Sequence, residues 1–599
     1  MVWGGRCRVE NKYKVLTNVL DIICKEAPSG SVTYHNLDNQ EKINLARSRS
    51  FIHLFLKVRF GLLKFLEREN LITDGSQDGG IDAYYIDKEK KKIYFIQSKF
   101  SNSSENFQNR TIQANDLIKM EIKNIIDGRT FDTRNVEFNS KIKRFIQEYS
   151  TLDNHAAYDF KVIFLGNLHN YTDEQIKKLT GQFEYEIYNF ERSYKELVYP
   201  ICSGIHYNPE EIYITINLHN KPNPVLEQVI STEYGDSDVR ITFVPAKEIG
   251  RIMAKYKNAL LQHNPRNYLT LSDNLVNEKI AESIINKQHN EFAILNNGIT
   301  IFAKKFKFSS GTGKENRGQI LITNPQIING GQTAYTLGEI YEDYKSRPED
   351  IFGDKEVLIK VIIDEDVENL NTKFVTNISN ATNQQTRVDE SDRRANDLTQ
   401  VKIQKLIFDE FGYYYERKKG EFYPGISLSY INKDLVLKRD NFIRAYYASK
   451  GSPAGARSSA SDTLFSINKF NEILDDTSKF KKMFFSYLLH KNLNRLKGPD
   501  WGNGIRYGKF AIVYAISLNC KPEEFENTKY QEEAIKRIKE IQKVWRNFEE
   551  QVSKKKENKS YLKSKNNFDF DTYYKGRTLT EDVKEFFKQN ETSNQIQTN

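Results

Sequence analysis

The stretch that decides the fold of the first part of the chain is Thr73-Asp-Gly-Ser-Gln-Asp-Gly-Gly-Ile-Asp82, together with Ile93-Tyr-Phe-Ile-Gln-Ser-Lys99. Apolar residues dominate positions 81–86 and 93–100, and these two runs flank the charged turn 87–92. Short apolar runs separated by a turn are typical of a β-hairpin. The sequence therefore predicts two antiparallel strands here.

The register of this hairpin brings polar side chains together. A turn centred between Glu89 and Lys90 places Asp82 opposite Gln97. Because side chains alternate along a strand, Lys99 emerges on the same face as Gln97. Opposed residues of two strands lie within about 5.5 Å of each other. A carboxylate, an amide oxygen and an ammonium group are thus expected to converge on one patch.

The elements around the hairpin predict one α/β domain with a mixed sheet over residues 1–200. The chain reads as helix up to about residue 70, and a helical stretch is expected over 116–126. A buried strand follows at 160–165, and a further helix at 173–179.

The remaining chain divides into three further parts. Residues 201–460 are expected to form a larger α/β module, in which strands and helices alternate over residues 226–460. From residue 461 to 588 the pattern is mostly helical and rich in lysine, and the polar tail 589–599 is typical of a disordered segment. The strands expected in the larger module are 294–303, 319–323 and 357–363.

Composition excludes several classes of protein. The 599 residues carry a formal charge of +9, a mild excess that permits nucleic-acid binding. Four cysteines without a C-x-x-C pair exclude a disulfide scaffold and a thiolate zinc site. The chain shows neither a signal sequence nor a run of about 18 apolar residues, so we expect a cytoplasmic protein without a membrane span.

The hairpin patch has the chemistry of phosphodiester hydrolysis. Asp82 can ligate Mg²⁺ or Mn²⁺, and the Gln97 oxygen is a weaker, neutral ligand. Lys99 can position the attacking water and offset the charge that builds up on the phosphorane. Gly79 and Gly80 leave room for a phosphate. The alternative is a solvated ion pair on facing strands, which is common in hairpins.

The motif Asp78-Gly-Gly-Ile-Asp82 followed by Gln97-Ser-Lys99 resembles the PD-(D/E)xK nuclease motif in its Mrr-like form. The resemblance implies a restriction-endonuclease-like fold, with Asp82 and Gln97 as metal ligands and Lys99 as the catalytic lysine. The family often adds a glutamate from the first helix, but no Asp or Glu occurs between Glu41 and Glu67. The candidates for this additional ligand are Asp78, which we place first, Glu67, Asp74 and His53.

A second polar constellation lies at Asn329-Gly-Gly-Gln-Thr333, where a short strand, a glycine turn and a helix are expected. Free amides at a helix start attract anions, and Gly330 and Gly331 let a phosphate approach. The alternative is a helix entry that serves packing alone. The residues that we expect at such a phosphate or nucleotide site are Asn297, Asn329, Gly330, Gly331, Gln332, Thr333, Arg387 and Arg417.

These segments together resemble the AIPR family, named for abortive infection and phage resistance. The resemblance covers roughly residues 230–480 and is carried by Asn296–Thr300, Asn324–Thr333, Asn380–Arg387 and Tyr414–Gly420. Members of the family commonly carry an N-terminal Mrr-like nuclease region, which is the arrangement expected here.

The resulting hypothesis is a metal-dependent endonuclease, a Mg²⁺-dependent phosphodiesterase that cleaves DNA in bacterial defence against phage. The module over 201–460 would sense a phage-derived trigger, hold nucleic acid or restrain the nuclease. The alternative is a non-catalytic regulator that binds nucleic acid or a nucleotide through a degenerate nuclease-like domain. Self-association into a homo-oligomer is left open.

Overall fold

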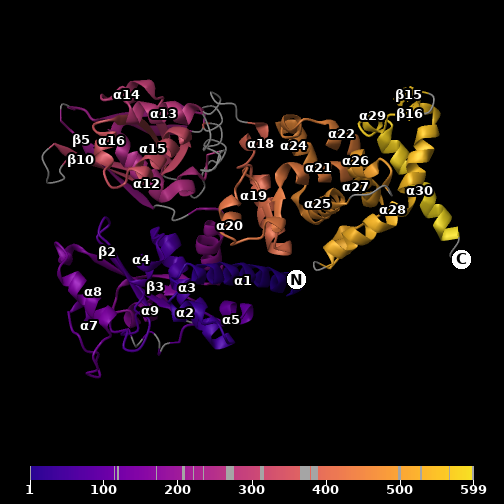
Figure 1. The fold of residues 1–599 in the computed structure, drawn as a ribbon. Helices are drawn as coiled ribbons and strands as arrows, with labels where there is room; N and C mark the ends of the chain where they lie inside the picture. Colours follow the sequence, from indigo (N-terminus) through magenta and orange to yellow (C-terminus); the bar gives the residue numbers. More distant parts are fainter. Residues whose placement is uncertain are drawn as a thin grey trace. The chain divides into compact units, whose positions relative to one another are not determined.

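The protein forms two compact units in a computed structural model (Figure 1). The first unit contains Met1–Ser379 and Gly420–Lys433, and the second contains Asn380–Lys419 and Asp434–Asn599. The described residues are 2–113, 115, 117, 120–169, 171–205, 210–219, 221–233, 235–264, 275–310, 316–364, 378, 389–496, 501–526, 529–564 and 567–596. This division differs from the sequence-based one, because the predicted 201–460 module contributes to both units.

The first unit begins with a four-stranded mixed sheet in the order β1-β2-β3-β4. Strands β1 and β2 pair antiparallel with Ala83 opposite Ile96 and Ile86 opposite Ile93, which confirms the predicted register. Strands β3 and β4 add in parallel. The strands are β1 (Ala83–Asp87), β2 (Lys92–Ser98), β3 (Asp159–Leu165) and β4 (Glu184–Tyr188).

Helices cover both faces of this sheet. Phe145 of α8 packs against Tyr84 and Phe95, whereas Phe60 of α3 packs against Tyr85 and Tyr94. Side chains alternate along a strand, so Asp82 and Gln97 belong to the face that α8 covers. The helices of this part are α1 (Val2–Lys25), α2 (Val32–His35), α3 (Gln40–Phe60), α4 (Phe65–Glu69), α5 (Ser104–Asn109), α7 (Ile122–Ile126), α8 (Ser140–Ser150), α9 (Asp173–Leu179), α10 (Phe190–Ser193) and α11 (Tyr199–Cys202).

Two of the sequence-based elements differ from the structure in this part. Of the helix expected over 116–126, residue 117 and α7 are helical but residues 120 and 121 are not, and residues 116, 118 and 119 lie outside the described residues. The segment expected to be helical up to about residue 70 forms four separate helices, α1 to α4. Gly61, which has a φ of +68°, ends α3 in the left-handed conformation that glycine adopts without strain.

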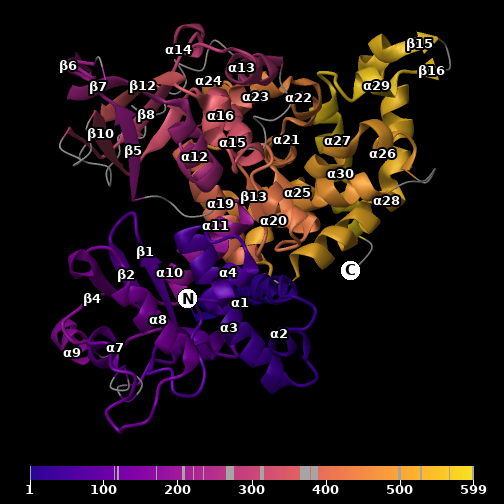
Figure 2. The same cartoon turned by 60° about the vertical axis from the view of Figure 1, so that its left-hand side comes forward.

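The rest of the first unit contains a five-stranded sheet, ordered β11-β8-β12-β7-β6, and a three-stranded sheet, ordered β5-β10-β9. Helices α12 and α15 pack against each other (Figure 2). Their contact is close at Gly250, where an added Cβ would lie 2.6 Å from the Leu337 carbonyl oxygen. The elements are β5 (Glu211–Asn217), β6 (Val225–Thr232), β7 (Gly235–Pro245), α12 (Ala246–Tyr256), α13 (Leu275–Ile285), α14 (Phe292–Leu295), β8 (Ile299–Ala303), β9 (Lys305–Ser309), β10 (Arg317–Thr323), β11 (Gln326–Asn329), α15 (Gly331–Asp343), α16 (Pro348–Phe352) and β12 (Glu356–Ile363).

The strand expected over 294–303 forms only from Ile299. Residues Phe292–Leu295 form α14 instead, and Gly298, at a φ of +77°, turns the chain into β8. The strands expected at 319–323 and 357–363 are confirmed within two residues as β10 and β12.

The second unit is mostly helical around one aromatic-rich core, as expected for residues beyond 461. Helix α30 continues to Ile596, through most of the tail that the sequence predicts to be disordered. Leu579 and Val583 are buried in that core and anchor the start of this helix. The main elements are α19 (Leu398–Phe411), β13 (Tyr414–Glu416), β14 (Val436–Lys438), α21 (Arg439–Ser449), α25 (Phe480–Arg495), α27 (Lys509–Leu518), α28 (Tyr530–Lys554) and α30 (Leu579–Ile596).

Residues 420–433, which include α20 (Tyr423–Ser427), belong to the first unit although both of their ends lead into the second. The Tyr430 carbonyl oxygen accepts a hydrogen bond from Asn18 Nδ2 at 2.6 Å. Its hydroxyl lies 3.2 Å from Lys57 Nζ and 3.3 Å from Glu26 Oε1. This segment is therefore part of the N-terminal core.

Replacing Gly425 with alanine tests the packing of residues 420–433. An added Cβ would overlap the Cys202 carbonyl oxygen, so we expect Gly425→Ala to lower the free energy of unfolding by about 1–3 kcal/mol. Gly30→Ala is the control, because no atom lies within 4 Å of its added Cβ. Equal stability of the two variants in urea unfolding would contradict the described packing.

Candidate metal centre

The loop that carries the predicted aspartates closes on itself. The backbone N–H groups of Thr73 and Asp74 both donate to the Asp82 carbonyl oxygen, at 2.9 and 3.0 Å. The Asp82 N–H in turn donates to Ile96 of β2 at 2.9 Å, which fixes the end of the loop to the sheet. Gly79 and Gly80, with φ of +64° and +71°, allow the tight return. The closed loop determines where its side chains point.

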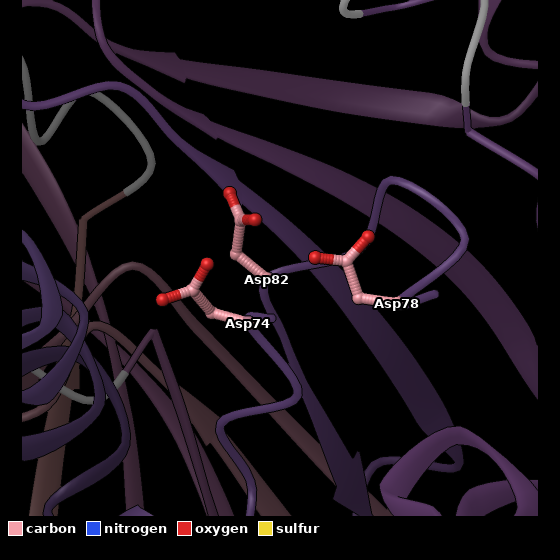
Figure 3. Close-up of side chains that lie close together, drawn as sticks. All are labelled: Asp74, Asp78 and Asp82. Carbon is pink, nitrogen blue, oxygen red and sulfur yellow. The ribbon is translucent and has the colours of Figure 1, made fainter. Parts of the chain in front are cut away.

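Three aspartates converge in this loop. One carboxylate oxygen each from Asp74, Asp78 and Asp82 lies within 4.8 Å of the others (Figure 3). All three side chains are half-buried. Such a group of carboxylates matches the oxygen ligands that Mg²⁺ and Mn²⁺ prefer. Asp78 is the residue that the sequence analysis placed first as a candidate for the additional ligand, and Asp74 was among the alternatives.

Burial and nearby negative charge shift the pKa of Asp82. Burial, together with the charges of Asp74 and Asp78, raises the pKa of Asp82 to about 8. The Ser98 N–H, 2.6 Å from Asp82 Oδ2, and the nearby charge of Lys99 act in the opposite direction. Like charges held this close destabilise one another, and a bound cation relieves that repulsion.

The Asp78 carboxylate is held by the glycines of the loop. Its Oδ1 accepts a hydrogen bond from the Gly80 N–H at 2.8 Å, and its Oδ2 accepts one from the Gly75 N–H at 3.2 Å. Burial raises the pKa of Asp78, and these two bonds oppose the shift. The side chain is therefore oriented before any ligand binds.

A polar network that the sequence analysis did not predict contacts the cluster at Asp74. Arg49 of α3 donates to Asp74 Oδ2 at 3.1 Å and to Glu69 Oε1 at 2.8 Å. Glu69 Oε2 also accepts hydrogen bonds from Tyr34 at 2.5 Å and His53 at 3.0 Å. Arg49 and Asp74 are 25 residues apart, and no sequence motif connects them.

The protonation of this network is set by burial and by hydrogen bonds. Burial lowers the pKa of His53 to about 4, although the hydrogen bond with Glu69 acts to raise it. Burial acts to raise the pKa of Glu69, but the bonds from His53 and Tyr34 and the charge of Arg49 lower it to about 2. At neutral pH the network therefore contains a neutral imidazole and an ionised carboxylate.

The other residues predicted for the metal site fall into two groups. Gln97 lies near the end of β2 and is 8% exposed, and Lys99 directly follows that strand. Both are close to Asp82 in the fold, since Asp82 bonds the residues on either side of Gln97. Glu67 is exposed on α4 and outside the acidic cluster. His53 contacts Glu69 rather than the cluster.

The glycine turn at residues 329–333 joins β11 to α15 as predicted. Gly330 has a φ of +77°, and a Cβ there would lie 2.6 Å from the Gly298 carbonyl oxygen, so the two turns pack backbone to backbone. Asn296 Nδ2 donates to Thr333 Oγ1 at 3.1 Å, so the turns are also in polar contact. Gly331 and Thr333 are buried, whereas Asn329, Gly330 and Gln332 are half-buried.

The cations expected near that turn are Arg387 and Arg417. Arg387 lies outside the described residues. Arg417 belongs to the second unit, where it donates to Gln404 Oε1 at 2.8 Å and to the Ala395 carbonyl oxygen at 3.1 Å. Asn297 lies between α14 and β8. An anion site at the turn stays a prediction, and the close packing of Gly330 accounts for the glycine there.

Comparison with protein families decides part of the classification. The sequence model of the AIPR protein family matches residues 261–561, half of the chain. The chain belongs to the AIPR family. Its membership confirms the resemblance based on the glycine turn and suggests a role in phage resistance. No curated protein and no solved structure matches the chain.

The AIPR match and the acidic cluster occupy different parts of the chain. The matched region starts after Leu260, whereas the three aspartates lie between residues 74 and 82. The Mrr-like resemblance of this N-terminal part therefore stays a prediction. Within the described residues, no helix has the length and apolar character needed to cross a membrane.

The buried imidazole of His53 predicts a pH dependence of stability. Its pKa is about 4 in the folded protein and near the ordinary 6.5 after unfolding. Between these values the unfolded chain binds the extra proton, so stability falls as the pH decreases from 6.5 towards 4. Between pH 7.5 and pH 5 we expect the wild type to lose about 2 kcal/mol through this group.

His53→Gln removes the titrating ring and should reduce that loss. The measurement is the free energy of unfolding of both proteins in urea at the two pH values. The same pH dependence in both proteins would show that His53 is not buried in its neutral form.

Proposed function

We propose that this AIPR protein is a metal-dependent nuclease that hydrolyses phosphodiester bonds of DNA in phage defence. The observation that carries the proposal is the convergence of Asp74, Asp78 and Asp82 at the edge of a mixed sheet, with Lys99 nearby. Oxygen ligands beside a lysine form a set of groups suited to phosphoryl chemistry.

The residues fit a small divalent cation. Two oxygens on one Mg²⁺ lie at most about 4.2 Å apart, since each bond is about 2.1 Å long. The three carboxylate oxygens lie within 4.8 Å of one another, so small side-chain rotations bring them to this size. Asp74, Asp78 and Asp82 would hold the ion, and Gln97 would be a neutral additional ligand.

Each residue of the site has a distinct part in the proposed reaction. A bound Mg²⁺ supplies a water of lowered pKa and offsets charge on the phosphate. Lys99 holds the attacking water and stabilises the negative charge that develops on the phosphorane oxygens. The Ser98 N–H keeps Asp82 oriented through its Oδ2. The formal charge of +9 favours a polyanionic substrate.

The test is cleavage of plasmid DNA with Mg²⁺ or Mn²⁺. We expect Asp82→Asn and Lys99→Ala each to lower the rate by about 100-fold or more, because each removes a group that acts on the reacting phosphate or its metal. Asparagine at position 82 can still accept the Ser98 hydrogen bond, so folding is preserved. Glu67→Gln is the control, because Glu67 is exposed and outside the cluster.

Two outcomes contradict the proposal. Wild-type rates in both variants would place the active site elsewhere. Metal-independent binding of DNA without cleavage would instead favour the alternative, a regulator with a degenerate nuclease-like domain.

A further inference from the structure

Arg49 links the acidic cluster to the polar network around Glu69. Its Nη1 donates to Asp74 Oδ2 at 3.1 Å and to the Asp74 carbonyl oxygen at 3.2 Å. Its Nη2 donates to Glu69 Oε1 at 2.8 Å, and its Nε donates to Tyr34 Oη at 3.1 Å. The side chain is only 12% exposed. All three guanidinium nitrogens are therefore used, and two of these bonds hold Asp74.

The guanidinium is itself held rigidly by its partners. Glu69 is fixed by Tyr34 and His53, and the His53 ring is fully buried and stacked on Phe65 at 4.3 Å between centroids. Because a planar guanidinium donates in fixed directions, these contacts leave Arg49 one arrangement. The same arrangement determines where the Asp74 carboxylate points.

We propose that Arg49 is a positioning residue that fixes Asp74 as a ligand of the metal centre. The inference rests on the proposed metal site and assigns no contact between Arg49 and the ion. Arg49 acts on Asp74 Oδ2 and on the Asp74 backbone, which leaves the other carboxylate oxygen of Asp74 to the cluster. Tyr34, His53 and Glu69 form the support for the guanidinium.

The direction of the expected effect separates positioning from simple electrostatics. Removing a positive charge beside the carboxylates would by itself attract a dication more strongly. Loss of positioning has the opposite effect, because a group that orients a metal ligand typically affects metal affinity by about 10–100-fold. Lysine keeps the charge of Arg49 but cannot reproduce its planar set of donors.

The chain offers a matched control on the same helix. Arg47 of α3 also forms a bidentate ion pair, in which Nε and Nη2 each lie 2.7 Å from an oxygen of the Asp21 carboxylate. Asp21 lies on α1 and outside the acidic cluster. Arg47→Gln therefore removes a comparable ion pair without touching Asp74.

The experiment measures Mn²⁺ binding to the full-length chain by electron paramagnetic resonance. We expect Arg49→Gln and Arg49→Lys each to raise the dissociation constant by about 10-fold or more, and Arg47→Gln to leave it unchanged. Circular dichroism and thermal unfolding verify that each variant is folded. An unchanged or lower dissociation constant in folded Arg49→Gln would overturn the inference.

A double-variant cycle tests whether Arg49 acts through Asp74. If it does, Arg49→Gln combined with Asp74→Asn binds Mn²⁺ as weakly as Asp74→Asn alone, because the second change has nothing left to disturb. Fully additive losses would indicate a general structural role and overturn the inference.

The same data separate this inference from the proposed function. Wild-type protein that binds no Mn²⁺, or binding that Asp82→Asn leaves unchanged, overturns both. Binding that depends on Asp82 but not on Arg49 retains the metal centre and removes only the positioning role.

Discussion

The closure of the loop from Thr73 to Asp82 is the constraint on which the candidate site depends. Two adjacent N–H groups bond one carbonyl oxygen, that of Asp82, and the Asp82 N–H bonds β2. The three aspartates are spaced four residues apart, and their carboxylates would lie far from one another in an extended chain. The closed loop therefore brings them together. The closure also concentrates negative charge. Burial of Asp82, together with the charges of Asp74 and Asp78, raises the pKa of Asp82. Arg49, which bonds Asp74, and Lys99, whose charge acts on Asp82, offset part of that negative charge.

The AIPR-matching region contributes structurally to the N-terminal unit. Residues 420–433 lie within the match, yet they pack against α1 and α3 through Tyr430. Lys57, which contacts Tyr430, stands two helical turns from Arg49 on the same face of α3, since residues four apart lie above one another. One helix thus carries both the contact with the AIPR region and the support of the acidic cluster.

The parts predictable from sequence are those governed by local rules. The hairpin register follows from the turn and the strand period, and it placed Asp82 near Gln97 correctly. The entry into α15 followed from its glycines. The involvement of Arg49 and Glu69 was not predictable, because it depends on how α3 and α4 pack against an irregular loop. The helical tail was missed because α30 is anchored by burial of Leu579 and Val583, at its start rather than in the tail.

The most direct test of the metal centre is a crystal of the full-length protein soaked in Mn²⁺ and measured at the manganese absorption edge. The account predicts an anomalous peak at about 2.0–2.6 Å from carboxylate oxygens of Asp74, Asp78 and Asp82. Absence of a peak at this cluster under saturating Mn²⁺, or a peak bound only by other residues, would contradict it.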